Sequence, residues 1–354
     1  MATQTQKAAI NVVFGAMNVG SPEAKAEGAR ITDLDDVGAV LDAFAARGYT
    51  EIDTARFYNK GTSEEWLGKA GWKAKNLSME TKLYPTKRAL TSTMRSRLPP
   101  ALIEELEKNG ITHSPEDLRK HLEISLEKLQ TDSIEIFYLH GPDREIPYEV
   151  TLKGVDALYR EGKFKRFGLS NFMAWEVVEI VNICKANGYV QPTVYQGGYS
   201  AIQRTVEPEL FPALRKFGIS FYAFSPLAGG FFTGKYASTQ TEPEAGSRMD
   251  PNNMHGRSLR ARYWNEPHFA ALAVVEAAIK PHDLTMPEVG MRWIAHHSQL
   301  KRQFGDAVLI GASSIKQLNE NLDDLEKGPL PEDVVKALDE AWTIIKGHAG
   351  VYFH

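Results

Sequence analysis

Short runs rich in β-branched and aromatic residues recur along the chain, separated by longer stretches in which apolar residues repeat with helical spacing. This alternation is typical of a parallel sheet whose strands are joined by crossover helices. The eight predicted strands are residues 10–15, 49–54, 77–82, 133–140, 164–170, 192–197, 219–225 and 306–311. Eight strands with crossover helices can close and leave no sheet edge, so we predict a (β/α)8 TIM barrel. A doubly wound open sheet is the alternative, although no feature of the sequence favours it.

The predicted helices carry start and stop signals. One helix has four apolar residues on a single face and a glycine after its end: Leu34, Val37, Leu41, Phe44 and Gly48. In another, Ser114 is the predicted N-cap and Pro115 follows it in the first turn. A further helix, over residues 331–347, follows the eighth strand and its own helix.

Two segments are too long for the regular strand and helix unit. Residues 84–113 lengthen the connection after the third strand and predict a surface insertion that contains a helix. Residues 236–264 lengthen the connection after the seventh strand, and we expect a long loop there that covers a ligand. No repeat or low-complexity tract divides the chain, so we predict one barrel domain over residues 1–354.

Composition narrows the class of protein. With 41 basic and 45 acidic residues the net charge is -4, so nothing suggests a surface that binds nucleic-acid phosphates. Cys184 is the only cysteine and follows Val177, Ile180 and Val181 on an apolar helix face, which excludes a disulfide framework and favours a reducing compartment. No stretch is long enough to span a bilayer, and the N-terminal apolar run is shorter than that of a signal peptide. We therefore expect a cytoplasmic enzyme that acts on a small molecule.

The carboxyl ends of the predicted strands carry polar side chains, and in a barrel these ends meet at one mouth. Asp53, Lys82 and His140 lie at the ends of the second, third and fourth strands, and Tyr58 closely follows the second. A positive Lys82 beside Tyr58 would lower the pKa of the phenol, and Asp53 would keep Lys82 charged and oriented. His140 could orient the oxygen that receives the proton of Tyr58. These four residues predict proton transfer to a carbonyl group.

Each of the four also has an ordinary structural interpretation. Asp53 with Thr54 can cap a turn, and Tyr58 can pack on the barrel rim, which is the commoner role of a single tyrosine. Lys82 can be a solvated strand end, and His140 a hydrogen-bonded histidine before a Gly-Pro turn. Their joint presence at the ends of neighbouring strands, with complementary chemistry, favours the catalytic interpretation.

Two other motifs have little functional weight. Residues 229–236, GGFFTGKY, nearly match a phosphate-binding loop, but Tyr236 stands where Ser or Thr would hold magnesium, which disfavours ATP hydrolysis. His296 and His297 are neighbours in a predicted helix and point to different faces, so a metal site is not expected. The chain also lacks the G-x-G-x-x-G fingerprint of a Rossmann domain.

The segments EIDTARFY, METK and FYLHGPD, which hold the four residues, resemble the motifs of the aldo-keto reductase superfamily. Further segments resemble its aflatoxin-aldehyde (succinic semialdehyde) reductase branch: GKFKRFGLSNF, PTVYQGGYSA, ELFPALRKFGISFYAFSPLAGGFFTGKY, GDAVLIGASSIKQLNENL and the terminal YFH. The resemblance covers nearly the whole chain apart from residues 84–113. It implies an NADPH-dependent reductase of aldehydes, with diketones and quinones as further substrates. In this family Tyr58 would be the general acid, Lys82 and Asp53 would assist it, and His140 would position the carbonyl.

The resemblance also implies that barrel loops hold the cofactor NADPH. The residues that correspond to the nicotinamide-amide site are Ser170, Asn171 and Gln196. Those that correspond to the adenosine 2′-phosphate site, where a helix N-terminus favours an anion, are Ser313, Gln317 and Asn321. The other implied cofactor residues are Met17, Asp53, Phe224, Ser225, Pro226, Leu227, Gly229, Lys235 and Arg248.

Two residues bear on the substrate. Arg262 corresponds to a residue that helps the branch bind a substrate carboxylate, which implies acidic aldehydes such as semialdehydes; the ordinary interpretation is a surface arginine. The branch often ends in arginine, whereas this chain ends in His354, a partly charged residue that would hold an anion less well near neutral pH. The branch also implies a homodimer.

Two other functions stay open on the same barrel. Some relatives, notably potassium-channel β subunits, are regulatory partners that bind the cofactor but turn over slowly; they depart from histidine at the place of His140, which this chain retains. An isomerase or lyase would need no nicotinamide, and GASSIKQLNEN, which resembles the 2′-phosphate site, argues against it.

Overall fold

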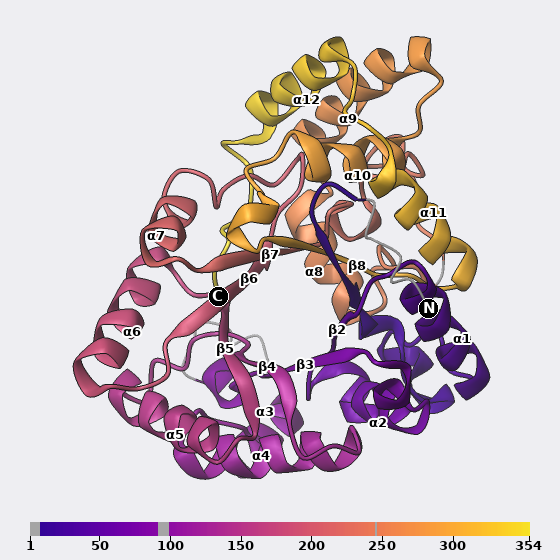
Figure 1. Cartoon of the computed structure of the whole chain (residues 1–354). Helices are drawn as coiled ribbons and strands as arrows, with labels where there is room; N and C mark the ends of the chain where they lie inside the picture. Colours follow the sequence, from indigo (N-terminus) through magenta and orange to yellow (C-terminus); the bar gives the residue numbers. More distant parts are fainter. Residues whose placement is uncertain (1–7, 91–98, 245) are drawn as a thin grey trace.

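The computed structural model describes residues 8–90, 99–244 and 246–354. Within them, parallel strands form a closed barrel in which each strand pairs with the next and the last pairs with the first (Figure 1). The strands are β1 Asn11–Gly15, β2 Glu51–Asp53, β3 Ser78–Leu83, β4 Ile134–Leu139, β5 Phe164–Ser170, β6 Pro192–Gly198, β7 Ser220–Phe224 and β8 Ala307–Ile310. The predicted (β/α)8 barrel is confirmed, and all eight strands lie where the sequence places them, with ends shifted by one or two residues at most.

Helices surround the barrel and connect successive strands (Figure 1). In the described residues they are α1 Leu34–Ala46, α2 Thr62–Lys69, α3 Pro100–Asn109, α4 Pro115–Lys128, α5 Tyr148–Arg160, α6 Ala174–Asn187, α7 Leu210–Phe217, α8 Met254–Tyr263, α9 Glu266–Ile279, α10 Met286–His296, α11 Ile315–Glu326 and α12 Glu332–Ile345. The helix predicted after the barrel is α12, which packs against α9.

Capping and periodicity explain two of these helices. In α1, Val37, Leu41 and Phe44 are fully buried as predicted. Leu34, the first residue of the helix, is 38% exposed, so its assignment to the same face as the buried residues is wrong. In α4 the Ser114 side chain accepts a hydrogen bond from the backbone of the first turn, as its predicted N-cap role requires.

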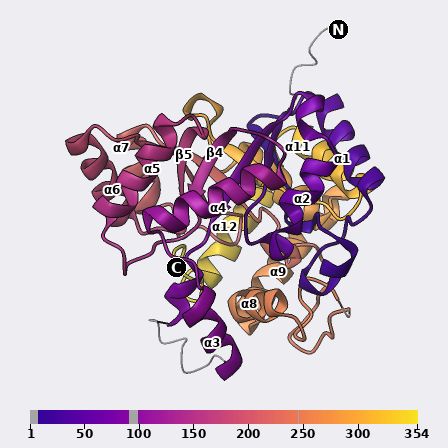
Figure 2. The same cartoon turned by 90° about the horizontal axis from the view of Figure 1, so that it is seen from below.

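The two long connections lie at the carboxyl ends of the strands. The insertion over residues 84–113 contains α3, none of whose side chains is buried; residues 91–98 of this predicted insertion lie outside the described part. Residues 236–264 were expected to be a loop, but their last part forms α8, capped by the Asn253 side chain, which accepts from Gly256 N at 2.6 Å. Figure 2 shows α3, α8 and the C-terminus on the same side of the barrel.

Apolar residues fill two layers, one inside the barrel and one between strands and helices. The inner layer consists of Val13, Ile136, Tyr138, Val194, Tyr222, Ala307 and Leu309. The outer layer includes Cys184 of α6, which is buried as its helix face predicts. No helix of the described residues is long and apolar enough to cross a membrane. Because side chains fill the barrel, a ligand approaches from the carboxyl ends of the strands.

Candidate active site

The mouth of the barrel holds a buried ion pair. Asp53 of β2 and Lys82 of β3 are 1% and 0% exposed. Lys82 Nζ donates to Asp53 Oδ1 at 2.7 Å, to Asp53 Oδ2 at 2.6 Å and to the backbone oxygen of Thr54 at 2.6 Å. All three hydrogens of the ammonium are therefore used, which fixes the position of its charge. Lys82 is not a solvated strand end.

The two charges of this pair support one another. Burial lowers the pKa of Lys82, but the adjacent Asp53 carboxylate outweighs it and raises the pKa above its ordinary value. Burial raises the pKa of Asp53, while Lys82 and Gln196, whose Nε2 donates to Oδ1 at 2.7 Å, oppose the rise. Lys82 therefore carries its positive charge near neutral pH, with Asp53 as its counter-ion.

Tyr58 lies beside the ion pair. It begins the turn Tyr58–Gly61, is half-buried, and has its ring centroid 4.9 Å from Lys82 Nζ. Burial raises the pKa of the phenol, and the Lys82 charge, acting in the predicted direction, lowers it only in part. Because burial outweighs this effect, the pKa of Tyr58 is raised overall. The phenol is protonated near neutral pH, which is the form that donates a proton.

The turn that carries Tyr58 is held by the residue after it. Asn59 has a left-handed backbone with φ of 50°, a conformation that asparagine tolerates better than most residues. Its Nδ2 donates to Met17 O at 2.8 Å and to Val19 O at 2.7 Å. These bonds tie the turn after β2 to the segment after β1, so Tyr58 is kept at the mouth rather than free on the rim.

His140 follows β4 and faces Tyr58, with ring centroids 5.9 Å apart and ring planes at 80°. Burial and the charge of Lys82 lower the pKa of His140 well below its ordinary value, so the imidazole is neutral near neutral pH. Asn171 Nδ2 donates to the backbone oxygen of His140 at 2.9 Å. In the described part of the chain, the buried Nδ1 has no hydrogen-bond partner. His140 is thus not the fully hydrogen-bonded histidine considered as its ordinary interpretation.

The three residues expected at a nicotinamide amide lie next to these groups and are buried: Ser170, Asn171 and Gln196. Asn171 has a left-handed backbone with φ of 64°, and its Nδ2 donates to Ser170 Oγ at 3.0 Å as well as to His140. Gln196 is anchored by its bond to Asp53. The ends of β5 and β6 therefore present amide and hydroxyl groups in fixed orientations beside the ion pair.

The segment after β7 borders the same mouth. Ser225 and Gly229 have left-handed backbones, with φ of 57° and 66°. A Cβ on Gly229 would lie 2.6 Å from Leu259 Cδ2, so a larger residue there would require the Leu259 side chain of α8 to shift. Phe224 and Leu227 are half-buried and present apolar surface beside these turns.

Four further residues are expected at the cofactor: Met17, Pro226, Lys235 and Arg248. Pro226 is buried and Lys235 is exposed. Met17 and Arg248 come together although they are far apart in the sequence, with Arg248 Nη2 at 3.6 Å from Met17 Sδ. Arg248 thereby places a positive charge over the segment after β1.

The segment after β8 forms a helix N-terminus. Ser314 is the N-cap of α11 and accepts from Gln317 N at 3.2 Å. Gln317 Oε1 in turn accepts from Ser313 N at 2.7 Å and from Ser313 Oγ at 2.9 Å, and both residues are exposed. Asn321, the third residue expected here, is buried and donates to Gly311 O at 3.1 Å. Its amide therefore supports the turn after β8.

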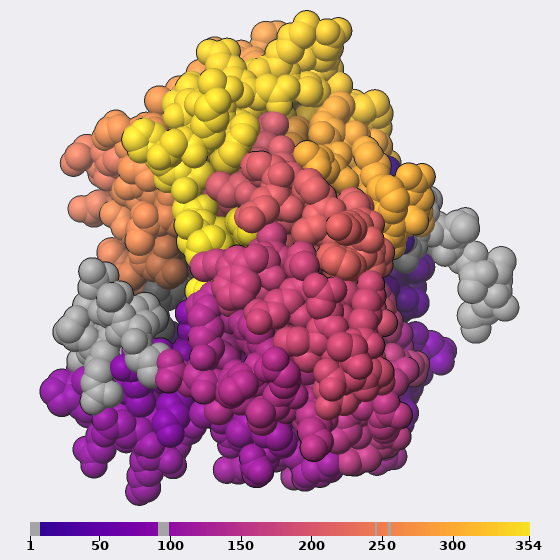
Figure 3. All heavy atoms as spheres, turned by 90° about the vertical axis from the view of Figure 1, so that its left-hand side faces the viewer, coloured from indigo at the N-terminus to yellow at the C-terminus, as the bar shows by residue number. Residues whose placement is uncertain are grey.

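The C-terminal tail reaches the mouth from the far end of the chain. His354 N donates to Asn171 O at 3.0 Å, and Arg144 Nη2 donates to His354 O at 3.0 Å. The ring of Tyr84 lies between the tail and the site, at 5.8 Å from the His354 ring and 5.7 Å from the His140 ring. Figure 3 shows the C-terminal residues, in yellow, descending between the orange and magenta segments of the surface.

Arginines surround this tail. Desolvation and the charges of Arg88, Arg262 and Arg144 lower the pKa of His354 to about 4. The expectation of a partly charged His354 is therefore wrong, since its ring is neutral near neutral pH. Arg262 of α8 lies against the tail, because a Cβ on Gly350 would be 3.4 Å from its Nε. In the described part of the chain, no carboxylate forms a salt bridge with Arg262.

Sequence reasoning missed three participants. Thr54 contributes a backbone carbonyl, which no residue type reveals. Tyr84 was detectable, because it lies two residues after Lys82 and strand alternation gives both the same direction. Arg144 reaches the tail through a contact between residues 210 positions apart, for which the sequence holds no signal.

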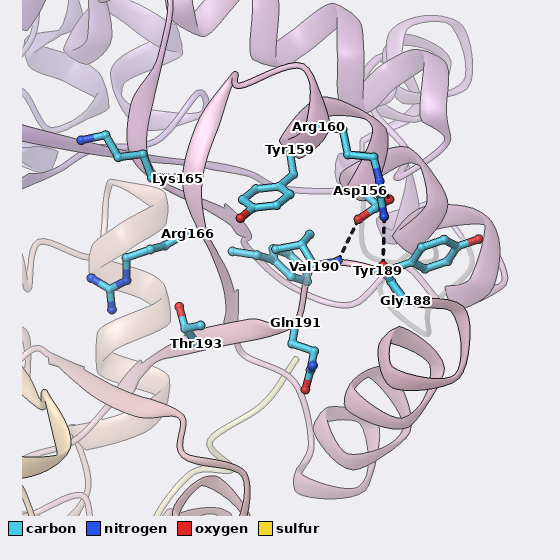
Figure 4. A pocket seen from close by; sticks show the side chains of 11 residues that line it. Asp156, Tyr159, Arg160, Lys165, Arg166, Gly188, Tyr189, Val190, Gln191 and Thr193 are labelled. Carbon is cyan, nitrogen blue, oxygen red and sulfur yellow. Dashed lines mark hydrogen bonds and ion pairs between the residues drawn. The ribbon is translucent and has the colours of Figure 1, made fainter.

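A cavity of about 430 Å³ lies away from the mouth, near the amino ends of β5 and β6 (Figure 4). Its cations are already engaged: Arg160 Nε donates to Asp156 at 2.5 Å and Nη2 to Gly188 O at 3.0 Å, and Lys165 pairs with Glu135 at 2.9 Å. None of the four catalytic candidates, Asp53, Tyr58, Lys82 and His140, lines this cavity, so the mouth is the candidate active site.

His296 and His297 make separate hydrogen bonds. His296 Nε2 lies 2.7 Å from Lys327 O, and His297 Nε2 accepts from Leu330 N at 2.9 Å. Across residues 8–90, 99–244 and 246–354, no group of three or more His, Cys, Asp or Glu side chains could hold a metal ion.

The comparison with known proteins agrees with this geometry. A sequence profile described as the aldo/keto reductase family matches residues 11–343. The chain is 45% identical over 314 residues to an aldo-keto reductase of Pseudocercospora fijiensis, covering 89% of the chain and 100% of that relative. It is 41% identical over 361 residues to aldo-keto reductase family 7 member A3 of Homo sapiens, and 39% identical over 357 residues to aflatoxin B1 aldehyde reductase member 4 of Homo sapiens, with 100% of each chain covered in both cases.

Proposed function

Because the chain belongs to the aldo/keto reductase family, we propose that it is an NADPH-dependent reductase that converts aldehydes to alcohols, with diketones and quinones as further substrates. The observation that carries the proposal is the group at the mouth: a protonated Tyr58 beside the Lys82 and Asp53 pair, with a neutral His140 facing it. The names of two relatives, an aldo-keto reductase and an aflatoxin B1 aldehyde reductase, support carbonyl reduction.

Each residue of this group has one task in the proposal. Tyr58 Oη donates its proton to the carbonyl oxygen as negative charge develops there. The fixed charge of Lys82 stabilises the phenolate that remains, and Asp53 keeps Lys82 charged and in place. His140, being neutral, orients the carbonyl oxygen toward Tyr58 through one ring nitrogen.

NADPH, when bound, supplies the hydride. The side chains that would hold its nicotinamide amide are Ser170, Asn171 and Gln196. Ser313 and Gln317, exposed at the N-terminus of α11, would hold the 2′-phosphate, because a helix N-terminus favours an anion. Asn321 would support that site from below. The other residues that would contact the cofactor are Met17, Asp53, Phe224, Ser225, Pro226, Leu227, Gly229, Lys235 and Arg248.

The proposed substrate class rests on Arg262 and His354 at the rim of the mouth. Arg262 would bind a carboxylate on an acidic aldehyde such as a semialdehyde, since its guanidinium has no carboxylate partner in the described residues. The neutral ring of His354 would contact the substrate without repelling or attracting its charge. A homodimer in the cytoplasm is part of the same proposal and rests on the branch that the chain resembles.

Fluorescence titration with NADPH, followed by a panel of carbonyl substrates with NADPH and NADH scored by kcat/KM, tests the function. We expect saturable NADPH binding and higher kcat/KM with NADPH. Tyr58→Phe should lose most turnover and retain NADPH affinity, because the hydroxyl donates a proton and does not hold the dinucleotide. Tyr159→Phe, on α5 and 39% exposed, is the matched control and should retain turnover. Absence of saturable binding, or full activity in Tyr58→Phe, contradicts the proposal.

A further inference from the structure

A second acidic residue lies directly below the catalytic group. Glu80 precedes Lys82 by two residues on β3, pairs in register with Asp53 of β2, and is fully buried. Its Oε2 accepts from Tyr138 Oη at 2.9 Å, while its Oε1 has no hydrogen-bond donor in the described part of the chain. A carboxylate in such a place would lack a cation of its own, because Lys82 Nζ is already bound by Asp53 and Thr54.

The charged and titratable groups that face Glu80 are few. They are Glu51 and Asp53 from β2, Lys82 from β3, Tyr138 from β4, Arg166 from β5 and Tyr222 from β7. The strands β1, β6 and β8 contribute the apolar residues Val13, Val194, Ala307 and Leu309 to this interior. Three of these residues are linked by hydrogen bonds. Tyr222 Oη donates to Glu51 Oε2 at 2.9 Å, and Arg166 Nη1 donates to Tyr222 Oη at 3.5 Å.

The groups around Glu80 favour its neutral form. Burial and the nearby carboxyl groups of Glu51 and Asp53 raise the pKa of Glu80 well above its ordinary value. An ionised Glu80 would place a second negative charge next to its register partner Asp53, with no donor for its Oε1 among the described residues.

Tyr138 contacts both Lys82 and Glu80. The ring centroid of Tyr138 lies 5.9 Å from Lys82 Nζ, and its hydroxyl donates a hydrogen bond to Glu80 Oε2. A Cβ on Gly168 would lie 2.2 Å from Tyr138 Cδ1, so glycine on β5 is what leaves room for this ring. Tyr138 thus lies between the ion pair of Lys82 and Asp53 and the carboxyl group of Glu80.

We propose that Glu80 keeps a proton in the working protein, and that loss of this proton sets the alkaline limit of the proposed reduction. Glu80 is a positioning residue that acts through Lys82 and Tyr58. Its ionisation adds a negative charge beside Asp53, which strengthens the hold on the Lys82 charge and makes Tyr58 a weaker acid. This inference rests on the proposed function for its catalytic consequence, although the protonation itself does not.

The first test needs no activity. The unfolding free energies of the wild type and of Glu80→Gln, which mimics the protonated form, are measured by denaturant titration from about pH 5 to about pH 9. A group with a raised folded pKa stabilises fully below its unfolded pKa and loses that contribution as pH rises. The wild type should therefore lose about tenfold in its folding equilibrium constant per pH unit relative to Glu80→Gln, until Glu80 ionises. A constant difference across this range would show that Glu80 is already charged and overturn the proposal.

The second test is the pH profile of kcat with NADPH and an aldehyde. The alkaline limb should move to higher pH in Glu80→Gln. Two further variants, which keep the test valid if that one folds poorly, should move it in opposite directions. Tyr138→Phe removes a hydrogen bond that favours the Glu80 anion, so the alkaline limb should move to higher pH. Glu51→Gln removes a like charge, so the alkaline limb should move to lower pH.

An unchanged limb in the three variants overturns the catalytic part of the proposal. Failure of the proposed function appears differently, as absent NADPH binding in the fluorescence titration. The unfolding comparison still reports whether Glu80 holds its proton in that case.

Discussion

Replacing Asp53 by asparagine removes the counter-ion of Lys82 while nearly preserving shape. Lys82 Nζ would keep its bond to Thr54 O and at most one bond to the new amide oxygen, for which Gln196 Nε2 competes. The charge of Lys82, 0% exposed, would then lie in the barrel without a partner. Removing one member of a buried ion pair costs about 3 to 5 kcal/mol, so Asp53→Asn should lower the free energy of unfolding by that amount near neutral pH.

The pH dependence of this loss has a definite sign. In the wild type the folded pKa of Lys82 is raised, so its stabilisation is complete below the unfolded pKa of about 10.4 and is lost as pH rises through the folded value. In Asp53→Asn burial is no longer opposed, and the folded pKa of Lys82 falls below the unfolded one. The stability of the variant should then rise with pH, and its difference from the wild type should shrink.

Denaturant unfolding followed by circular dichroism at several pH values measures both effects. The matched control is Asp42→Asn, because Asp42 pairs with Lys75 at 2.6 Å but is 62% exposed. An exposed pair contributes about 0 to 1 kcal/mol, so the control should lose no more than that. If Asp53→Asn loses as little as Asp42→Asn, or if its deficit grows with pH, the buried ion pair does not have the role argued for it.

Three further variants test other contacts. Gly168→Ala should lower the unfolding free energy by about 1 to 3 kcal/mol, because its Cβ would meet the Tyr138 ring, and the double variant with Tyr138→Ala should lose less than the sum; additive losses in denaturant unfolding would contradict the clash. Arg262→Ala should reduce kcat/KM for carboxylated aldehydes by about tenfold or more, the value of a charge-assisted hydrogen bond, and leave neutral aldehydes nearly unaffected; equal losses would refute the carboxylate role. Asn59→Ala should cost about 1 to 3 kcal/mol for its two hydrogen bonds and lower turnover by loosening the turn of Tyr58, and an unchanged melting temperature would argue against that support.

The sequence alone determined the architecture and the identity of the main catalytic candidates. Strand propensity and helical periodicity are local properties, so eight strands and their connecting helices could be counted directly. The barrel rule then places the strand ends together, which is enough to assign Asp53, Lys82 and His140 to one mouth. Local signals failed where tertiary contacts decide, as for Leu34, which has the helical spacing of a core residue but lies outside the packed face.

The tertiary structure alone decided the chemistry of these groups. Burial outweighs the lowering of the Tyr58 pKa by Lys82, and the ring of His354 is neutral because it is desolvated and because arginines from distant segments lie at the tail. In the sequence nothing distinguishes Glu80, two residues before Lys82. It becomes a candidate for a protonated carboxyl group only in the fold, where Glu51, Asp53 and Tyr138 lie around it. The physical reason is the same in each case: a pKa depends on desolvation and on the distances between charges, and folding sets both between residues that the sequence keeps apart.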